Sequence, residues 1–417
     1  MGNEASQQIQ QKYGDKLDND ITISWSKSNF EDPFQPREGH SSCSHGNRLF
    51  VFGGLVKTGE LDTEESNDLI LFDLDTSTWT KVEAKGQIPA PRVGATIQQI
   101  GGKLYLFGGL SRDLGWFQDL YVFDIASSTW SKPNTTGQPP SMRDKLSSAV
   151  IGTNMYIFGG FGPQAGMEEE GDEEDEEYED EDEVPEDQEG ASFGWFNDIH
   201  VLDTDTNTWS SPMYMNLALP TQRAAADMCA IDKYLVIFGG RDAEGRKNDL
   251  HIYNTETRKW ETELNITGQQ PAPRSFHTVT AVGPRVVVLG GRGISDNHFG
   301  DVHIFDTISR QWLQPKVEGE SYTARGTHSA TVVGERLIVY GGTSNYSQET
   351  MQCQVFHKDM FMLNTAEVLA GGAMDQPVSE NKENCRAGTC NDLEMEPEAK
   401  TQEHTKKTTP NILEPRN

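Results

Sequence analysis

The chain is organised by short apolar runs, each placed directly before a pair of glycines. Polar residues do not alternate within these runs, so each run is predicted to form a strand covered on both faces. The runs are LFVF, LYLF, MYIF, YLVIF, VVVL and LIVY, and the glycine pairs stand at 53/54, 108/109, 159/160, 239/240, 290/291 and 341/342. Their successive spacings are 55, 51, 80, 51 and 51 residues, which indicates six copies of one unit.

A second strand and a tryptophan follow the glycine pairs. The second strands open on aspartates, namely Asp68, Asp119, Asp198, Asp249, Asp301 and Asp359. In five units a tryptophan stands six residues after an Asp or Asn, across Thr, Ser and Asn residues that close β-hairpins. These tryptophans are Trp79, Trp130, Trp209, Trp260 and Trp312. Each unit is therefore predicted to hold four antiparallel strands.

An arginine stands ahead of each apolar run, and we refer to these six as the register arginines. They are Arg37, Arg92, Arg143, Arg223, Arg274 and Arg325. A unit of about 50 residues cannot bury both faces of its sheet alone, but six units can stack around an axis. The sequence therefore predicts an all-β, six-bladed β-propeller over residues 21–366. The combination of Arg, Gly-Gly and Trp resembles the kelch repeat.

The sixth unit lacks its tryptophan, because the position six residues after Asn364 is Ala370. The missing strand is expected at the other end of the chain, where residues 21–27 (ITISWSK) contain Trp25. An N-terminal strand that completes the last blade would close the ring without leaving an open sheet edge.

Positions at which the units differ are the candidates for a binding site, because recurring residues are explained by packing. In kelch propellers the loop after Gly-Gly and the residues after the register arginine open on one rim of the central channel. The candidates for this rim are Arg241, Arg246, Arg292, Lys145, Ser275, Phe161, Phe276 and Trp195. Guanidinium forks pair with carboxylate or phosphate, so the rim predicts an anion site. Ordinary solvated loop arginines are the alternative.

Five segments resemble the kelch-domain substrate receptors of cullin-RING ubiquitin ligases that recognise C-terminal diglycine degrons. They are RDKLS (143–147), IFGGFG (157–162), GWFNDIHVLD (194–203), FGGRDAEGRKNDLH (238–251) and PRSFH (273–277). The resemblance implies that Arg241, Arg246 and Ser275 grip the terminal carboxylate of a peptide. It also implies that the pocket is completed by Lys145, Phe161, Trp195 and Phe276, with phenylalanine at 161 and 276 in place of the family's Tyr and Trp.

The same receptors carry an apolar helical box after the propeller, which docks the elongin and cullin adaptor. Residues 366–417 offer no comparable amphipathic stretch, so cullin-RING components are an unsupported partner. Two hypotheses follow for the function. The first is a binder of peptides or proteins with a free C-terminal carboxylate or another anionic group, and the second is a non-catalytic scaffold that uses other propeller surfaces or the acidic loop.

The charge of the chain is −30, and one block contributes much of it. Residues 168–189 hold 17 Asp or Glu and no Lys or Arg, so the net charge without them is −13. This balance argues against nucleic acid as a partner. The acidic insertion, residues 167–190, lies in the loop after Phe161 in the third unit. It is interpreted as a disordered, solvated segment, or alternatively as an intramolecular competitor for the arginine cluster.

Both ends of the chain are predicted to lie outside the propeller. Residues 1–20 read as a flexible N-terminus, and Gly2 with Ser6 fits the myristoylation pattern, which would give weak and reversible membrane contact. Residues 367–417 are polar and are predicted to be a disordered tail, in which Lys382, Glu383 and Asn384 match the KEN-box degron.

Scattered cysteines and the lack of a secretory segment predict a cytoplasmic protein, with the nucleus and a transient membrane-associated state left open. Neither the copper-oxidase nor the ferrous-iron residue pattern of catalytic kelch propellers is found. No cofactor, metal site or enzymatic activity is expected.

Overall fold

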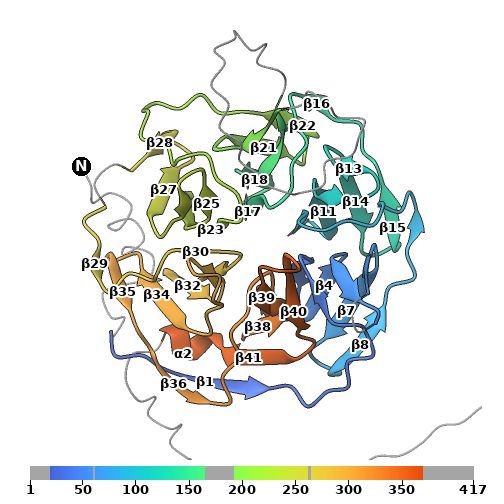
Figure 1. Ribbon diagram of the computed structural model, residues 1–417. Helices are drawn as coiled ribbons and strands as arrows, with labels where there is room; N and C mark the ends of the chain where they lie inside the picture. The colour runs from blue at the N-terminus through green and yellow to red at the C-terminus, as the bar shows by residue number, and fades with distance from the viewer. Residues whose placement is uncertain (1–18, 60–61, 165–191, 262–263, 370–417) are drawn as a thin grey trace, which may run out of the picture. The chain divides into compact units, whose positions relative to one another are not determined.

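Nearly all of the regular secondary structure in the described residues is β-strand. The computed structural model describes residues 19–59, 62–164, 192–261 and 264–369, all within one compact unit. Within these residues, six sheets of four or five strands stand around a central axis, and the chain visits them in turn (Figure 1). This confirms the predicted all-β, propeller architecture.

The sheets are numbered first to sixth in chain order, and their strands are named from the axis outward. The first contains β3 (Ser41–His45), β4 (Arg48–Phe52), β7 (Leu69–Asp73) and β8 (Thr78–Lys81); the second contains β10 (Thr96–Ile100), β11 (Lys103–Phe107), β14 (Leu120–Asp124), β15 (Thr129–Ser131) and β9 (Lys85–Gly86); the third contains β17 (Ser147–Ile151), β18 (Asn154–Phe158), β21 (Ile199–Asp203), β22 (Thr208–Ser210) and β16 (Thr136–Gly137). The fourth contains β23 (Asp227–Ile231), β24 (Tyr234–Phe238), β27 (Leu250–Asn254) and β28 (Lys259–Trp260); the fifth contains β31 (Thr278–Val282), β32 (Arg285–Leu289), β34 (Val302–Asp306), β35 (Gln311–Leu313) and β29 (Thr267–Gly268); the sixth contains β37 (Ser329–Val333), β38 (Arg336–Tyr340), β41 (Met360–Asn364), β1 (Thr22–Lys27) and β36 (Lys316–Gly319).

Smaller ribbons, built from the segments after the register arginines and after the glycine pairs, carry the positions at which the units differ. They are β2 (Arg37–Glu38) with β5 (Leu55–Lys57) and β6 (Thr63–Glu65), β12 (Leu110–Ser111) with β13 (Gly115–Trp116), β19 (Phe161–Gln164) with β20 (Ser192–Trp195), β25 (Arg241–Asp242) with β26 (Gly245–Arg246), β30 (Arg274–Ser275) with β33 (Arg292–Gly293), and β39 (Thr343–Ser347) with β40 (Gln352–Phe356).

The predicted closure of the ring is confirmed. Strand β1 lies between β36 and β41 in the sixth sheet, parallel to the first and antiparallel to the second. Trp25 stands opposite Leu363 and is only 3% exposed. The strand that the sixth repeat lacks is therefore supplied by the N-terminal segment, and the sheet has no exposed edge at that point.

Each register arginine joins its own glycine pair to the rest of its sheet. Its Nη1 donates to the carbonyl of the first glycine, sixteen residues further on, over 2.8–3.1 Å. Five of them also pair with the aspartate that opens the second strand, as Arg274 does with Asp301 at 2.7 Å. All six arginines are buried, so these partners supply the compensation that a buried charge requires.

A closed circle of six backbone hydrogen bonds links the sheets near the axis. Each N–H donates to the carbonyl of the matching residue of a neighbouring sheet over 2.8–3.1 Å, in the order Gly39, Thr327, Phe276, Ala225, Lys145, Gly94 and back to Gly39. All six have φ between +51° and +63°, which costs a residue other than glycine about 1–2 kcal/mol. The circle persists because both neighbours of each member fix its conformation.

A short helix extends the ordered chain beyond the predicted end of the propeller. Helix α2 (Thr365–Leu369) packs on the last two sheets, with Val368 fully buried and its carbonyl accepting a 2.6 Å hydrogen bond from Arg285. The boundary predicted between residues 366 and 367 falls within this helix of five residues, which a tertiary contact holds in place.

The remaining predictions for the termini and the insertion fall outside the described residues. These are Gly2 with the N-terminal segment up to residue 18, the acidic insertion 167–190, and the tail from residue 370, including residues 382–384. In the described part of the chain, no helix has the length and apolar character to cross a membrane.

Candidate anion-binding site

The predicted arginine cluster lies on two neighbouring ribbons at the rim. Arg241 and Arg246 are direct cross-strand partners in the ribbon β25–β26, and Ser275 and Arg292 are partners in β30–β33. Direct partners project from the same face of a ribbon. Asp242 stabilises the turn of β25–β26, because it is buried and pairs with Lys247 at 3.1 Å.

Arg246 connects the two ribbons. Its Nε donates a 3.0 Å hydrogen bond to the hydroxyl of Ser275, and its Nη2 lies 3.2 Å from a carboxylate oxygen of Asp296. Ser275 is fully buried, so its oxygen fixes Arg246 from below. Among the described residues nothing accepts from Nη1 of Arg246, and this part of the guanidinium is available to a ligand.

Arg292 is held within the protein. Its Nε and Nη2 reach the same oxygen of Asp296 at 2.9 and 2.7 Å, and its guanidinium carbon stands 3.4 Å from the ring centroid of Tyr346. The stacking and the ion pair leave the Arg292 side chain only 16% exposed. Arg292 belongs to the cluster, as predicted, but its contacts are to Asp296 and Tyr346.

Arg241 has the opposite environment. It is exposed, and no ion pair with it is found within the described residues. Its backbone is nevertheless fixed, because it exchanges two 2.9 Å hydrogen bonds with Ala224. A guanidinium on a rigid backbone with no internal carboxylate is suited to meet an anion from solution.

The pKa values show that these charges interact. Burial and the neighbouring guanidiniums of Arg292 and Arg241 lower the pKa of Arg246, while Asp296 opposes this change. Burial would raise the pKa of Asp296, but the guanidiniums of Arg292 and Arg246 hold it below the ordinary value. Arg246 and Arg292 thus share one ionised carboxylate, and Arg241 has none among the described residues, which leaves a local positive excess on a strongly negative chain.

The predicted apolar side chains form a second group on the third sheet's ribbon. Phe161 and Trp195 are cross-strand partners whose ring centroids are 5.5 Å apart, and Lys145 Nζ lies 5.8 Å from the centroid of Phe161. Trp116 of the second sheet continues the wall, with its ring 6.3 Å from that of Phe161. Its indole N–H donates to the buried Asp144 at 3.1 Å.

The two groups meet at the central cavity. Lys145 and Phe276 both belong to the closed backbone circle, where Ala225 stands between them. Lys145, Phe276 and Arg292 line a cavity of about 550 Å³ that is walled further down by the inner strands. The structure therefore brings Lys145, Phe276 and Arg292 to one cavity. The other predicted residues lie on the neighbouring ribbons and do not line it, namely Arg241, Arg246, Ser275, Phe161 and Trp195.

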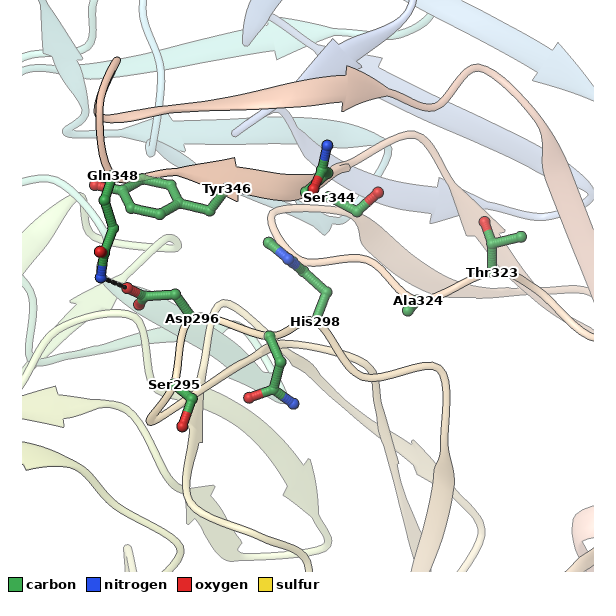
Figure 2. Close-up of a pocket in the computed structure, with 10 residues that line it drawn as sticks. Ser295, Asp296, His298, Thr323, Ala324, Ser344, Tyr346 and Gln348 are labelled. Carbon is green, nitrogen blue, oxygen red and sulfur yellow. Dashed lines mark hydrogen bonds between the residues drawn. The ribbon is translucent and has the colours of Figure 1, made fainter.

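A second hollow lies on the outer side of Asp296. It has a volume of about 750 Å³ and is bounded by residues 295–298 and by the β39–β40 ribbon. Figure 2 shows Asp296 and Gln348 facing each other at its edge, with Tyr346 beside them. His298 also lines this pocket, and burial together with the nearby arginines lowers its pKa to about 4, so it is neutral near pH 7.

Sequence reasoning missed the acceptor and the stacking partner of this site. Asp296 stands in the polar loop GISDNHF, where an aspartate is expected to shape a turn, and Tyr346 lies four residues beyond the glycine pair of the sixth unit. Only the spacing of four between Arg292 and Asp296 was a signal, and outside a helix this spacing implies no contact.

The recurring histidines have structural contacts. His200, His251 and His303 bond the aspartates of the register arginines at 2.8–2.9 Å. His277 Nε2 lies 3.0 Å from the backbone carbonyl of Phe238 in the neighbouring sheet, which identifies Nε2 as the donor. Among the residues that the structure describes, no group of three His, Cys, Asp or Glu side chains is placed to hold a metal ion.

Repeated sheets of four or five strands around one axis, each with a buried register arginine and a glycine pair, are typical of a β-propeller of the kelch type. Residues 39–170 and 186–368 match the model of the KLHDC2/KLHL20/DRC7 Kelch-repeats domain. Kelch domain-containing protein 1 of Mus musculus is 31% identical over 322 residues, covering 75% of this chain and 76% of that protein. Kelch domain-containing protein 2 of Bos taurus is 29% identical over 336 residues, covering 74% and 76%. The chain belongs to the kelch-repeat domain family.

Proposed function

We propose that this propeller binds proteins or peptides through a free C-terminal carboxylate, with Arg241 and Arg246 as the groups that hold the anion. The kelch family assignment indicates a protein-binding propeller. The observation that carries the finer proposal is the geometry of Arg246, whose Nε is fixed on Ser275 while Arg241 stands beside it as an exposed cross-strand partner. Two neighbouring guanidiniums offer a carboxylate several charge-assisted donors, each worth about 1.5–3 kcal/mol when desolvated.

The apolar wall supports a peptide as the ligand rather than a free inorganic anion. Trp195, Phe161 and Phe276 are each partly exposed at the rim, and aromatic faces are suited to packing against a peptide backbone and small side chains. The terminal residues of the peptide are expected to be small, because the closed backbone circle allows little movement beneath them. A receptor role in a ubiquitin ligase is the most specific form of this proposal.

The experiment is a screen of a random C-terminal peptide library on the purified chain, followed by titration of the selected peptide in free and amidated forms. We expect amidation to abolish binding, and Arg241→Ala to weaken the free peptide about 10- to 100-fold. Arg336→Ala removes an exposed arginine of the sixth sheet and is the matched control. Equal affinity for the free and amidated peptides would refute the proposal.

A scaffold function is the second candidate, and one surface favours it. Met213, Met215 and Leu217 are 77%, 62% and 91% exposed along the outer edge of the fourth sheet, where Met215 N–H bonds the carbonyl of Arg258 at 2.9 Å. Arg258 and Lys259 are exposed beside them. This edge suits a protein whose apolar segment is flanked by acidic residues. For such a partner, Met215→Asp would abolish binding and Arg241→Ala would not change it.

A further inference from the structure

Asp296 stands between two guanidiniums that come from different sheets. One of its oxygens accepts from Arg292 at 2.7 and 2.9 Å and lies 3.2 Å from Nη2 of Arg246. We propose that Asp296 is a positioning residue that holds Arg246 in its ligand-binding orientation by neutralising Arg292. This inference rests on the proposed function, since it assigns a role within the same anion site.

The backbone presents Asp296 at a fixed place. Its φ is +60°, a conformation that aspartate tolerates better than most residues, and its N–H donates to the carbonyl of Gly293 at 2.9 Å. From the sixth sheet's ribbon, Gln348 approaches its second oxygen at 3.4 Å (Figure 2). The carboxylate is thus a junction between three ribbons, those of the fourth, fifth and sixth sheets.

Charge repulsion explains why the junction needs a carboxylate. Arg246 and Arg292 both reach one oxygen atom, so without its charge two cations would face each other in a partly buried place. Arg292 is stacked on Tyr346, with 3.4 Å from its guanidinium carbon to the ring centroid, which restricts its movement. Arg246 would therefore be the group that moves, and its bond to Ser275 would be strained or lost.

The orientation of Arg246 argues against Asp296 as a mere competitor of the ligand. Ser275 takes Nε and Asp296 takes one side of Nη2. Neither occupies Nη1, which has no acceptor among the described residues. Asp296 thus contacts one edge of the Arg246 guanidinium and leaves Nη1 free to donate to a ligand that Arg241 also contacts. A residue in this position should strengthen ligand binding although its charge has the same sign as the ligand's.

The test is a double-mutant cycle in the full chain with Asp296→Asn and Arg292→Gln, measured by titration of the selected peptide in free and amidated forms. Asp296→Asn keeps the shape and removes the charge, and we expect about a tenfold loss of affinity for the free peptide and a smaller ratio between the two forms. Adding Arg292→Gln should recover most of that loss, because the repulsion then disappears. Asp113→Asn, an exposed aspartate in the corresponding ribbon of the second sheet, should change nothing.

The opposite outcomes overturn the inference. Unchanged binding by Asp296→Asn would mean that the carboxylate does not affect the ligand, and tighter binding would mean that it competes with the ligand. Additive losses in the double variant would show that Asp296 does not act through Arg292. Thermal unfolding checks that each variant is folded, and Asp296→Ser serves if the asparagine variant is not. If the unaltered chain itself fails to distinguish free from amidated peptide, the proposed function fails first, which separates the two results.

Discussion

Two sets of arginines in this molecule have the same chemistry and different partners. The six register arginines are buried, and each donates to a glycine carbonyl sixteen residues away. The rim arginines Arg241, Arg246 and Arg292 lie on the ribbons of the fourth and fifth sheets. Within the described residues Arg246 and Arg292 share one carboxylate, Asp296, and Arg241 has no ion pair. The charges of the first set are satisfied almost wholly inside the fold, whereas those of the second are not.

Whether the protein itself satisfies an arginine's charge therefore distinguishes structural arginines from candidate binding residues. A buried guanidinium must have its donors satisfied by the protein, so the register arginines recur together with the glycine carbonyl that accepts from them, and most also have an aspartate partner. The excess of cations at the rim has no such internal explanation. We therefore expect changes in the first set to affect stability, and changes in the second to affect binding.

The largest expected effect is on stability, in the variant Arg274→Ala. Arg274 donates to the Gly290 carbonyl at 2.8 Å and to both oxygens of Asp301, and it stacks 4.2 Å from the ring centroid of Phe299. Its removal leaves Asp301 with less compensation, so we expect the free energy of unfolding to fall by about 3–5 kcal/mol. Denaturant unfolding measures this loss.

The control for this prediction is Arg241→Ala, the exposed rim arginine. It should change the free energy of unfolding by less than about 0.5 kcal/mol. Losses of similar size in the two variants would contradict the division between scaffold and rim.

The ring was predictable from the sequence because its packing repeats. Trp25, Trp79 and Trp130 are all buried where the six-residue spacing and the missing sixth tryptophan put them. Helix α2, which spans the predicted end of the propeller, is held by a hydrogen bond from Arg285 to the carbonyl of Val368. That bond joins residues 83 positions apart, and no local pattern announces it.

The candidate site was predicted in part, and the limit has a physical cause. Arg241, Arg246 and Ser275 were grouped by aligning the units, because the two variable segments open on one rim in kelch propellers, and by the resemblance to the kelch-domain receptors. The role of Asp296 depends on the left-handed turn that aims its carboxylate at Arg246. A single aspartate in a polar loop gives no indication of that direction.

Asp227 is a carboxylate with no arginine partner among the described residues, and it extends this comparison with a smaller expected effect. Asp227 opens the inner strand of the fourth sheet, where the other sheets have Ser or Thr. It accepts from the N–H groups of Met228 and Val279 at 2.9 and 2.6 Å. Burial nevertheless raises the pKa of Asp227 to about 7. Asp296, which is less buried and has arginine partners, has a lowered pKa, so the difference in burial and the guanidiniums together account for the contrast.

A raised carboxyl pKa means that stability falls as pH rises from about 4 to about 7, because the folded chain then keeps a proton that the unfolded chain has lost. The free energy of unfolding of Asp227→Asn, minus that of the unaltered protein, should therefore be about 1–2 kcal/mol larger at pH 7.5 than at pH 5.5. The buried histidines titrate in both proteins and cancel in this difference. Thermal or denaturant unfolding at the two pH values measures it, and a difference that does not change with pH would contradict the prediction.

The smallest expected effect is on peptide affinity in Arg241→Lys, a variant that tests whether charge alone or donor geometry matters at the rim. Arg241→Lys keeps the positive charge but replaces the planar fork of donors by a single ammonium group. If a carboxylate bridges Arg241 and Arg246, this variant should bind the free C-terminal peptide about three- to tenfold more weakly than unaltered protein, yet more tightly than Arg241→Ala. Its affinity should also fall more steeply with added salt, because a point charge without paired hydrogen bonds is screened more effectively. Equal affinities for Arg241→Lys and unaltered protein would mean that the rim attracts anions only by its net charge, and the distinction between the two sets of arginines would then concern burial alone.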